Sequence, residues 1–354
     1  MIRESVTYFL YPVSLLYAFI VRLRNVFFDI RLFRSKRLPV PVISVGNITM
    51  GGTGKTPAVA YIARLLEDNG YRVGILSRGY KRDSRGYVVV SDGETVLVDA
   101  GRGGDEPVML AQNLPGAVVA VDEQRYRGGM LLVKNYHPDV VILDDGFQHR
   151  WIHRDLDVLL VNASKREQMR GTPPVGRLRE SLSALNRADI IIVTKFTDDE
   201  DFLKMDSLVQ NYTAAPVLSS SIEASSCIDV LHNAVLPVET IRGKKAFLFS
   251  GIAETDDFRR TAETLGVELC GIRWFGDHHR FSRGDVHGLL EKGEKSGAEL
   301  FLTTEKDAVR LSVLKKFIIQ NTPLYALRIL FRVNEKDEGV LRRYIHNTMN
   351  RYKH

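Results

Sequence analysis

The chain has 354 residues, of which 44% are hydrophobic and 26% charged, a normal globular composition with room for two domains. Its two cysteines, Cys227 and Cys270, lie far apart and form no C-x-x-C pair. This argues against a disulfide framework or a zinc site and fits a reducing compartment. The net charge is +6, and the first 40 residues, with seven basic and two acidic side chains, carry most of it. Such a local patch does not indicate a surface for nucleic acid.

The first segment of the chain is strongly apolar. Residues 5–21, SVTYFLYPVSLLYAFIV, contain no charged side chain. A transmembrane helix would be at its lower length limit here, with Pro12 inside it, and a signal peptide would need a clearer basic start and cleavage site. An interfacial helix with aromatic side chains and a basic end fits best, so we expect a membrane-surface region over residues 1–38. The alternative is a helix buried against the protein's own core.

The next part of the chain alternates between apolar runs and amphipathic segments. The runs are rich in Val, Ile and Leu, as expected for strands buried on both faces of a parallel sheet. They cover residues 40–46, 72–79, 117–122, 139–146, 157–163 and 189–195. We expect helices at residues 55–69, 106–114 and 123–136, and a hairpin at residues 87–99 with Asp-Gly at its turn. The pattern predicts a doubly wound α/β fold with a mostly parallel sheet.

A second, shorter alternation follows a looser region. Its apolar runs are residues 245–251, 268–275, 299–307 and 323–331. We therefore expect a second, smaller α/β domain. The expected division is a core domain at 39–211, a linker at 212–244, the smaller domain at 245–333 and a basic C-terminal helix at 334–354.

A glycine-rich loop follows the first apolar run, and a helix follows the loop. Its sequence GGTGKT (residues 51–56) ends the phosphate-binding pattern G-x-x-x-x-G-K-[ST], although Thr49 stands where the first glycine is usual. Backbone N–H groups of such a loop and the helix N-terminus bind phosphates, the lysine reaches the β- and γ-phosphates, and the threonine hydroxyl binds Mg²⁺. The alternative is a glycine-rich turn that binds nothing. The expected nucleotide-binding residues are Gly51, Gly52, Thr53, Gly54, Lys55 and Thr56, in a fold like that of the P-loop NTPases.

Two adjacent carboxylates end the fourth apolar run. Asp144 and Asp145 lie in VVILDDGFQH, where a P-loop enzyme places the acid of its metal site. Neighbouring carboxylates repel unless a cation lies between them, which favours a role in binding Mg²⁺. The alternative is a pair of helix caps, because Asp-Gly is common at turns.

The acceptor of a phosphoryl group would distinguish a kinase from a nucleotide switch. The guanine-binding pattern N/T-K-x-D is not met at residues 193–198, VTKFTD, because Asp198 stands one residue too far along. A kinase needs a base for the acceptor hydroxyl. Asp105 and Glu106, in GRGGDEP, follow a glycine turn at an expected helix start, which would keep a carboxylate ionised. An ordinary helix cap is the alternative.

Taken in order, the motifs VGNITMGGTGKTP, LSRGY, GDEP, DDGFQH, LRES, DHHRF and TTEKDAVRL resemble those of the tetraacyldisaccharide 4'-kinases, the lipid A 4'-kinases of Gram-negative bacteria. The resemblance extends from the apolar N-terminal segment to about residue 312. Some positions depart from the family's usual pattern. Lys81 follows SRGY where glycine is common, Arg177 and Ser181 stand where prolines are usual, and Glu254-Thr255 replace part of a GIxNP pattern.

The resemblance implies a kinase that uses ATP and Mg²⁺ to phosphorylate the 4'-hydroxyl of tetraacyldisaccharide 1-phosphate, giving lipid IVA in lipid A biosynthesis. It implies that Asp105 is the catalytic base, that His278 is its partner, and that Lys55 contributes to catalysis. Because Asp105 and His278 come from different alternations, we expect the active site in a cleft that the smaller domain closes. The other residues that the resemblance assigns are Arg179 at the nucleotide, Glu180 with Thr56, Asp144 and Asp145 at the metal, and Glu106, Arg125 and His149 at the substrate.

A lipid substrate gives the N-terminal segment a purpose, because acyl chains do not leave a bilayer readily. We expect the protein on the cytoplasmic face of the bacterial inner membrane, peripheral or N-terminally anchored, against an anionic surface. No nucleic acid and no obligate protein partner are expected. Two alternatives remain: a P-loop switch or chaperone NTPase that acts on a partner protein, and a membrane scaffold that retains the loop as structure.

Overall fold

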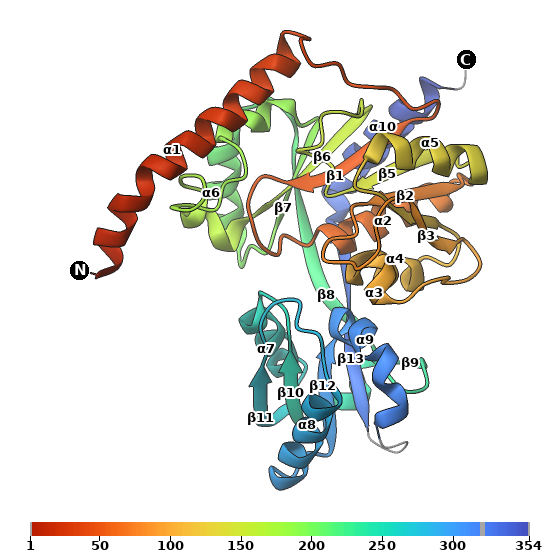
Figure 1. Ribbon diagram of the computed structural model, residues 1–354. Helices are drawn as coiled ribbons and strands as arrows, with labels where there is room; N and C mark the ends of the chain where they lie inside the picture. Colours follow the sequence, from red (N-terminus) through yellow and green to blue (C-terminus); the bar gives the residue numbers. More distant parts are fainter. Residues whose placement is uncertain (1, 319–322, 353–354) are drawn as a thin grey trace.

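The computed structural model describes residues 2–318 and 323–352 and has two lobes (Figure 1). The first lobe is built on a sheet whose strands are parallel except for the antiparallel edge strand β3. Each of the six predicted runs contains one parallel strand, which confirms the predicted doubly wound sheet. The strands are β1 (Val42–Asn47), β2 (Val73–Ser77), β3 (Val88–Asp92), β4 (Val118–Val121), β5 (Val140–Asp144), β6 (Leu156–Asn162) and β7 (Ile190–Thr194).

Two long antiparallel strands join the lobes (Figure 1). They are β8 (Val217–Asp229), which pairs with β7 in the first lobe, and β13 (Leu324–Val333), which pairs with β12 in the second. The sheet order is β11-β10-β12-β13-β8-β7-β6-β1-β5-β2-β4-β3, with β9 paired to β8. Residues 212–244 are therefore not the loose region that we expected, since they contain the whole of the regular strand β8. The other strands of the second lobe are β9 (Val235–Leu236), β10 (Lys245–Ser250), β11 (Glu268–Trp274) and β12 (Leu300–Thr304).

Helices cover both faces of the first-lobe sheet. The three predicted helices are present as α2, α4 and α5, with boundaries shifted by one or two residues. The predicted hairpin at residues 87–99 is only half formed. Asp92 caps its turn by accepting hydrogen bonds from two backbone N–H groups, but the returning segment makes a single bridge, Ser91 to Val96. The helices are α2 (Lys55–Glu67), α3 (Ala100–Gly103), α4 (Asp105–Asn113), α5 (Arg125–Tyr136), α6 (Asp199–Gln210), and the 3₁₀ turns η1 (Ala163–Gln168) and η2 (Leu182–Arg187).

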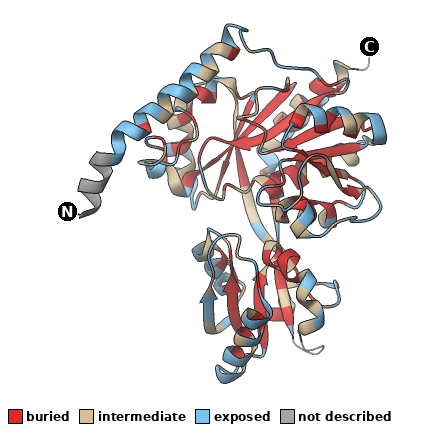
Figure 2. Ribbon diagram, in the orientation of Figure 1, coloured by how far each residue is buried: buried red, intermediate tan, exposed pale blue. Residues whose placement is uncertain are grey.

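The chain returns to the first lobe after the second. Helix α10 (Glu335–Asn350) packs its buried residues Leu341, Ile345 and Met349 into the same core as α2. This packing accounts for the predicted C-terminal helix, and Figure 2 shows the buried sheet that the first-lobe helices cover. The second lobe contains α7 (Thr255–Thr264), α8 (Arg283–Lys295), α9 (Glu305–Leu311), η3 (Val238–Ile241) and η4 (Ser312–Phe317).

The apolar N-terminal segment forms one long helix, α1 (Ile2–Asp29), which lies along the outside of the first lobe (Figures 1 and 2). Only 6% of its window Leu10–Asp29 is buried, so the alternative of a core helix is wrong. One stripe of α1 does contact the protein. Ser14 and Thr172 exchange hydrogen bonds, and the hydroxyl of Tyr17 donates to the carbonyl of Arg179.

Candidate active site

The glycine-rich loop connects the carboxyl end of the central strand β1 to α2. Gly54 has a positive φ of 80° and precedes the first residue of α2, so the loop turns into the helix through a conformation that favours glycine. Lys55 and Thr56 are the first two residues of α2. The backbone N–H groups here have no helical partner, which is the arrangement that binds phosphate.

Polar side chains from three strand ends hold the loop in this shape. The side-chain amide of Asn47, from β1, donates to the hydroxyl of Thr53 at 2.9 Å. The amide of Asn162, from β6, donates to the carbonyl of Gly52 at 3.2 Å, and the hydroxyl of Thr194, from β7, donates to the carbonyl of Thr53 at 3.2 Å. These three residues were missed in the sequence, although each is the last residue of its strand.

Asp144 and Asp145 end β5 beside this loop. The ammonium group of Lys55 lies 3.6 Å from Asp145, and Arg179 donates to both oxygens of Asp145, at 2.9 and 2.8 Å. Burial alone would raise the pKa of Asp145, but Lys55 and Arg179 together lower it below its ordinary value. The structure thus brings Arg179, Asp145 and the P-loop lysine together, as the resemblance implied.

Asp144 is in the opposite electrostatic situation. Its side chain is 1% exposed, and burial, followed by the carboxylates of Glu106 and Asp145, raises its pKa well above the usual range. Ser77 donates to one carboxylate oxygen, while the other has no hydrogen-bond partner among the described residues. A buried carboxylate with an unpartnered oxygen, close to two further carboxylates, fits a divalent cation that would offset their repulsion.

Asp105 occupies the first position of α4 and meets the second lobe there. Its Oδ2 lies 3.0 Å from Nδ1 of His278 and accepts a 2.7 Å hydrogen bond from Nε of Arg310. Burial would raise the pKa of Asp105, but the hydrogen bond to His278 and the charge of Arg310 lower it below its ordinary value. The carboxylate is therefore ionised at neutral pH and lies between the lobes, where we expected it.

Arg310 was missed in the sequence, although the motif TTEKDAVRL contains it. Its guanidinium donates to the carbonyl of Gly251 at 2.8 Å and to Asp307 at 2.9 Å. Asp307 is fully buried and also accepts from the hydroxyls of Ser250 and Thr304. Contacts within the second lobe therefore hold the Arg310 guanidinium in the position from which it donates to Asp105.

Glu106 interacts with residues of both lobes. It follows Asp105 on α4 and accepts a 2.7 Å hydrogen bond from Lys306 of the second lobe. Burial raises its pKa, whereas Lys306, and to a lesser extent Lys55, lower it, with a net shift downward. The charges of Lys55 and Asp145 both act on the pKa of Glu106, so Glu106 is close to the P-loop lysine and to one carboxylate of the predicted metal site.

Arg125 and His149 lie close to each other, and Arg125 is also close to Asp144. Burial lowers the pKa of Arg125 to about 10 and that of His149 to about 4. Arg125 is therefore still charged at neutral pH, and His149 is neutral. One guanidinium nitrogen of Arg125 donates to the carbonyl of Asp122, and its Nε has no partner among the described residues. This unpartnered donor is available for an anionic or hydroxyl ligand.

Glu180 bonds to residues other than the metal carboxylates in this structure, and its predicted role as a metal ligand stays a prediction. Its carboxylate is fully buried and accepts hydrogen bonds from Arg24 at 3.0 Å, Asn25 at 2.7 Å and Arg187 at 2.7 Å. Two of these donors lie on α1. Arg179, the residue before Glu180, donates to Asp145. Glu180 therefore connects α1 to the segment that holds Asp145.

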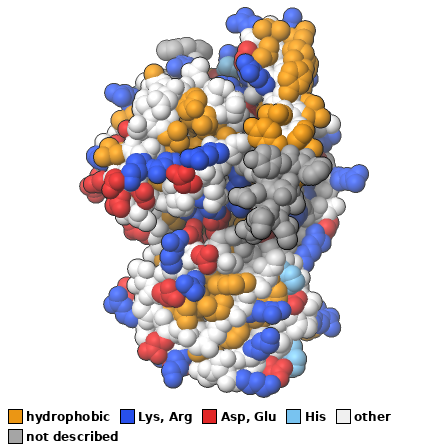
Figure 3. Space-filling model, turned by 90° about the vertical axis from the view of Figure 1, so that its left-hand side faces the viewer, with side chains coloured by type: hydrophobic (Ala, Val, Ile, Leu, Met, Phe, Trp, Pro, Cys, Tyr) orange, Lys and Arg blue, Asp and Glu red, His pale blue; other side chains and the backbone are white. Residues whose placement is uncertain are grey.

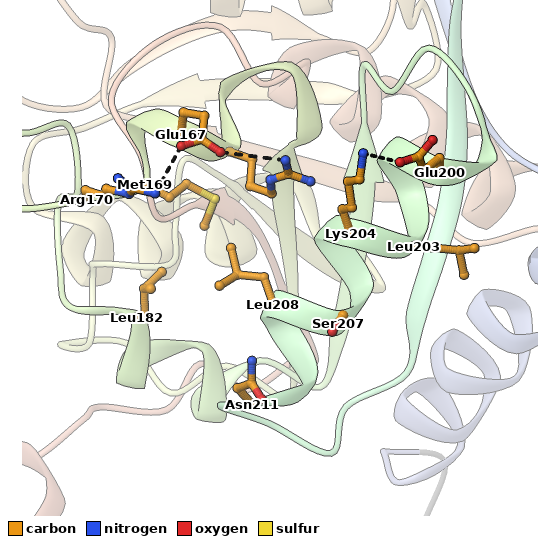
Figure 4. Close-up of a pocket in the computed structure, with 11 residues that line it drawn as sticks. Glu167, Met169, Arg170, Leu182, Glu200, Leu203, Lys204, Ser207, Leu208 and Asn211 are labelled. Atoms are coloured by element: carbon orange, nitrogen blue, oxygen red, sulfur yellow. Dashed lines mark hydrogen bonds and ion pairs between the residues drawn. The ribbon is translucent and has the colours of Figure 1, made fainter.

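A separate groove of about 650 Å³ opens between η1 and α6 (Figure 4). Its floor is apolar, with Met169 and Leu182, and its basic side chains are already paired with acidic ones. Arg170 lies 3.0 Å from Glu167, and Lys204 pairs with Glu200. The groove contains none of the predicted site residues.

Three comparisons with known proteins agree. Residues 6–349 match the family described as LpxK: Tetraacyldisaccharide-1-P 4'-kinase. The chain is 38% identical over 328 residues to a tetraacyldisaccharide 4'-kinase of Pelobacter propionicus, covering 92% of this chain and 89% of the relative. It is 39% identical over 319 residues to that of Geobacter metallireducens, covering 88% and 90%.

A solved structure extends the likeness to the whole fold. The crystal structure of LpxK from Aquifex aeolicus, described as an apo form in complex with ATP, superposes with a TM-score of 0.80 at 34% identity. The match covers 99% of this chain and 100% of that one, so both lobes and α1 are included. The chain therefore belongs to the tetraacyldisaccharide-1-phosphate 4'-kinase family.

Proposed function

We propose that the protein transfers the γ-phosphoryl group of ATP to the 4'-hydroxyl of tetraacyldisaccharide 1-phosphate. The observation that carries this is the Asp105–His278–Arg310 cluster, a fixed and ionised carboxylate at the junction of the lobes, next in sequence to Glu106, which interacts with Lys55. A nucleotide switch has no need of such a base. The names of the relatives and the ATP in the Aquifex structure support the same acceptor and donor.

In this proposal the first lobe binds the nucleotide. The backbone N–H groups of residues 51–56 and the N-terminus of α2 would hold the phosphates, and Lys55 would lie against the β- and γ-phosphates. Thr56 and Asp144 are the residues best placed to hold Mg²⁺, which neutralises charge that develops on the phosphoryl oxygens. Asp145 keeps Lys55 and Arg179 oriented toward the same space.

Asp105 accepts the proton of the sugar hydroxyl. A carboxylate with a lowered pKa is a weak base, but in a loose transition state the proton leaves the nucleophile late, when the forming phosphate ester has made it acidic. His278 and Arg310 fix the carboxylate and stabilise its charge. Arg125 supplies a donor for an anionic group of the substrate, and the neutral His149 and Glu106 line the adjoining wall.

The membrane proposal rests on α1. Its exposed side carries a continuous row of large apolar side chains, visible as the orange stripe above the grey atoms in Figure 3. The helix is long and apolar enough to cross a membrane, with a mean hydropathy of 1.2 over Leu10–Asp29. Its opposite stripe, however, is hydrogen-bonded to the protein, so lipid cannot surround it. We propose that α1 lies on the cytoplasmic face of the inner membrane. The side chains exposed by more than half are Tyr11, Val13, Leu15, Leu16, Phe19 and Ile20.

Not all basic residues near α1 are available to anionic lipid. Arg24 pairs with Glu180, Arg37 lies 3.8 Å from Asp155, and the ammonium group of Lys36 lies over the ring of Tyr126. Arg24 is therefore held by the buried Glu180, whereas Lys36 and Arg37 remain exposed in spite of these contacts.

The direct test is transfer of label from γ-labelled ATP to tetraacyldisaccharide 1-phosphate in mixed micelles. The wild type should label the lipid, and Asp105→Ala and Lys55→Ala should each lower the rate by about a hundredfold or more. Asp139→Asn, which breaks an exposed ion pair with Arg72, is the matched control and should retain activity. ATP hydrolysis without labelled lipid would overturn the assigned acceptor and favour the switch.

A further inference from the structure

A carboxylate from the second lobe lies on the P-loop. Glu254 precedes α7, and its Oε1 accepts a hydrogen bond from the backbone N–H of Gly52 at 3.4 Å. A Cβ added at Gly52 would lie 2.8 Å from Cγ of Glu254, so the side chain is packed directly on the loop. Backbone N–H groups in such a loop bind the oxygens of phosphates. The Glu254 carboxylate therefore occupies part of the surface that a nucleotide needs.

A lysine holds the same carboxylate from the first lobe. Lys165, on η1 after β6, forms an ion pair with Oε1 of Glu254, and the two side chains are only 18% and 17% exposed. A Cβ at Gly51 would lie 3.5 Å from Oε1 of Glu254 and 3.7 Å from Nζ of Lys165. The ammonium group is thus next to the glycine loop, and Glu254 neutralises it there.

A second cation converges on this point. The guanidinium of Arg177 would also lie 3.7 Å from a Cβ at Gly51, and its backbone carbonyl accepts a hydrogen bond from Met50 of the loop. Among the described residues, Arg177 forms no ion pair. The loop therefore has two cations and one carboxylate at its mouth, a set that matches the charge of a polyphosphate better than that of a single carboxylate.

The start of α7 is fastened to the first lobe at one further point. Asp257, in the first turn of α7, pairs at 2.5 Å with Lys195, which follows β7. This pair comes from the same segment as Glu254 but does not contact the P-loop. The two pairs can therefore be broken separately.

We propose that Glu254 occupies the phosphate site of the nucleotide-free protein, and that Lys165 passes from Glu254 to the phosphates when nucleotide binds. Lys165 is then a nucleotide-binding residue that sequence motifs do not mark. Glu254 must leave the loop, since its charge would face the β- and γ-phosphates. A nucleotide with several phosphates displaces it, whereas AMP gains too little. The proposal deepens the proposed function but depends only on nucleotide binding, not on the lipid acceptor.

The test measures ATP, ADP and AMP binding by titration calorimetry without lipid. Glu254→Gln keeps the side-chain shape but removes the competing charge. It should therefore lower the Kd for ATP by about tenfold, with a smaller change in the Kd for AMP. Lys165→Met should raise the Kd for ATP by about tenfold, also when it is combined with Glu254→Gln. Asp257→Asn, which breaks the ion pairs with Lys195 and Arg260 but keeps Glu254, should leave ATP binding within about twofold.

Two results would overturn the proposal. If Glu254→Gln leaves ATP affinity unchanged or lowers it, the carboxylate does not compete with phosphate. If Lys165→Met has no effect once Glu254 is neutral, then Lys165 serves only to hold Glu254. Thermal denaturation of each variant separates these results from misfolding. A protein that passes this test yet labels no lipid would refute the proposed acceptor and leave the phosphate exchange standing.

Discussion

The two carboxylate centres of the site are assembled in different ways. Asp145 is paired with Lys55 and Arg179, all within the first lobe. Asp105 is on the first lobe, but its partners His278 and Arg310 come from the second. The nucleotide centre is therefore complete in one lobe, whereas the base is fixed only when both lobes meet. Phosphate binding and activation of the acceptor should therefore be separable by mutation.

The largest expected effect separates the two centres directly. Asp105→Asn removes the base but keeps the size of the side chain, so kcat should fall by about 10²- to 10⁴-fold. The Kd for ATP should stay within about twofold, because no P-loop contact changes. Single-turnover transfer and nucleotide titration on the same preparation measure both. An equal loss in ATP binding would show that the centres are not separable.

Arg310→Met should lower kcat by roughly tenfold to a hundredfold. It should also move the acidic limb of the kcat/KM profile to higher pH. Arg310 lowers the pKa of Asp105, so the wild-type base stays ionised as the pH falls. Without Arg310, burial raises that pKa, and the base is protonated at a higher pH. A slower enzyme with an unmoved limb would mean that Arg310 has only a structural role.

The first centre is expected to depend on α1 through Glu180. Arg187→Met removes one of three donors to a fully buried carboxylate and should lower the free energy of unfolding by about 2 kcal/mol. Arg170→Met is the matched control, since its pair with Glu167 is on the surface and its side chain is 81% exposed. Urea unfolding measures both. Equal effects would argue against a supporting role for the Glu180 cluster.

The smallest expected effect concerns the outer side of α1. Phe19 is 61% exposed, so Phe19→Ser should not change the unfolding free energy appreciably. It should weaken binding to anionic phospholipid vesicles by roughly tenfold, because the ring would no longer enter the interface. Flotation with vesicles measures the partition. Unchanged vesicle binding would shift the membrane contact away from α1.

Much of the nucleotide centre could be predicted from the sequence because its parts are local. The loop at residues 51–56 and the Asp144-Asp145 pair each follow a strongly apolar strand, and parallel strands bring their carboxyl ends to one edge. Asp105 and His278 could be paired only through the family resemblance. Arg310 was out of reach because its position depends on Gly251 and Asp307, which are set by the fold of the second lobe.

The same limit applies to Glu180, whose hydrogen-bond partners come from α1 and from Arg187. Arg179 and Glu180 are adjacent in sequence and lie in a bend after Leu178, but their side chains have different partners. One reaches Asp145, and the other reaches Arg24 and Asn25 of α1. Ser14 and Tyr17 likewise look like tolerated hydroxyls in an apolar run, and only the docked helix shows that they contact Thr172 and Arg179.

The return of the chain to the first lobe bears on the order of events during synthesis. Helix α2 leaves the ribosome early, yet its apolar face belongs to a core that also contains Phe331, Leu341 and Ile345, which come late in the chain. A nascent chain therefore carries its nucleotide-binding helix partly uncovered until translation has passed β13 and α10. Such exposure favours aggregation and chaperone capture. Truncations before α10 should accordingly be found in the insoluble fraction rather than as a folded first lobe.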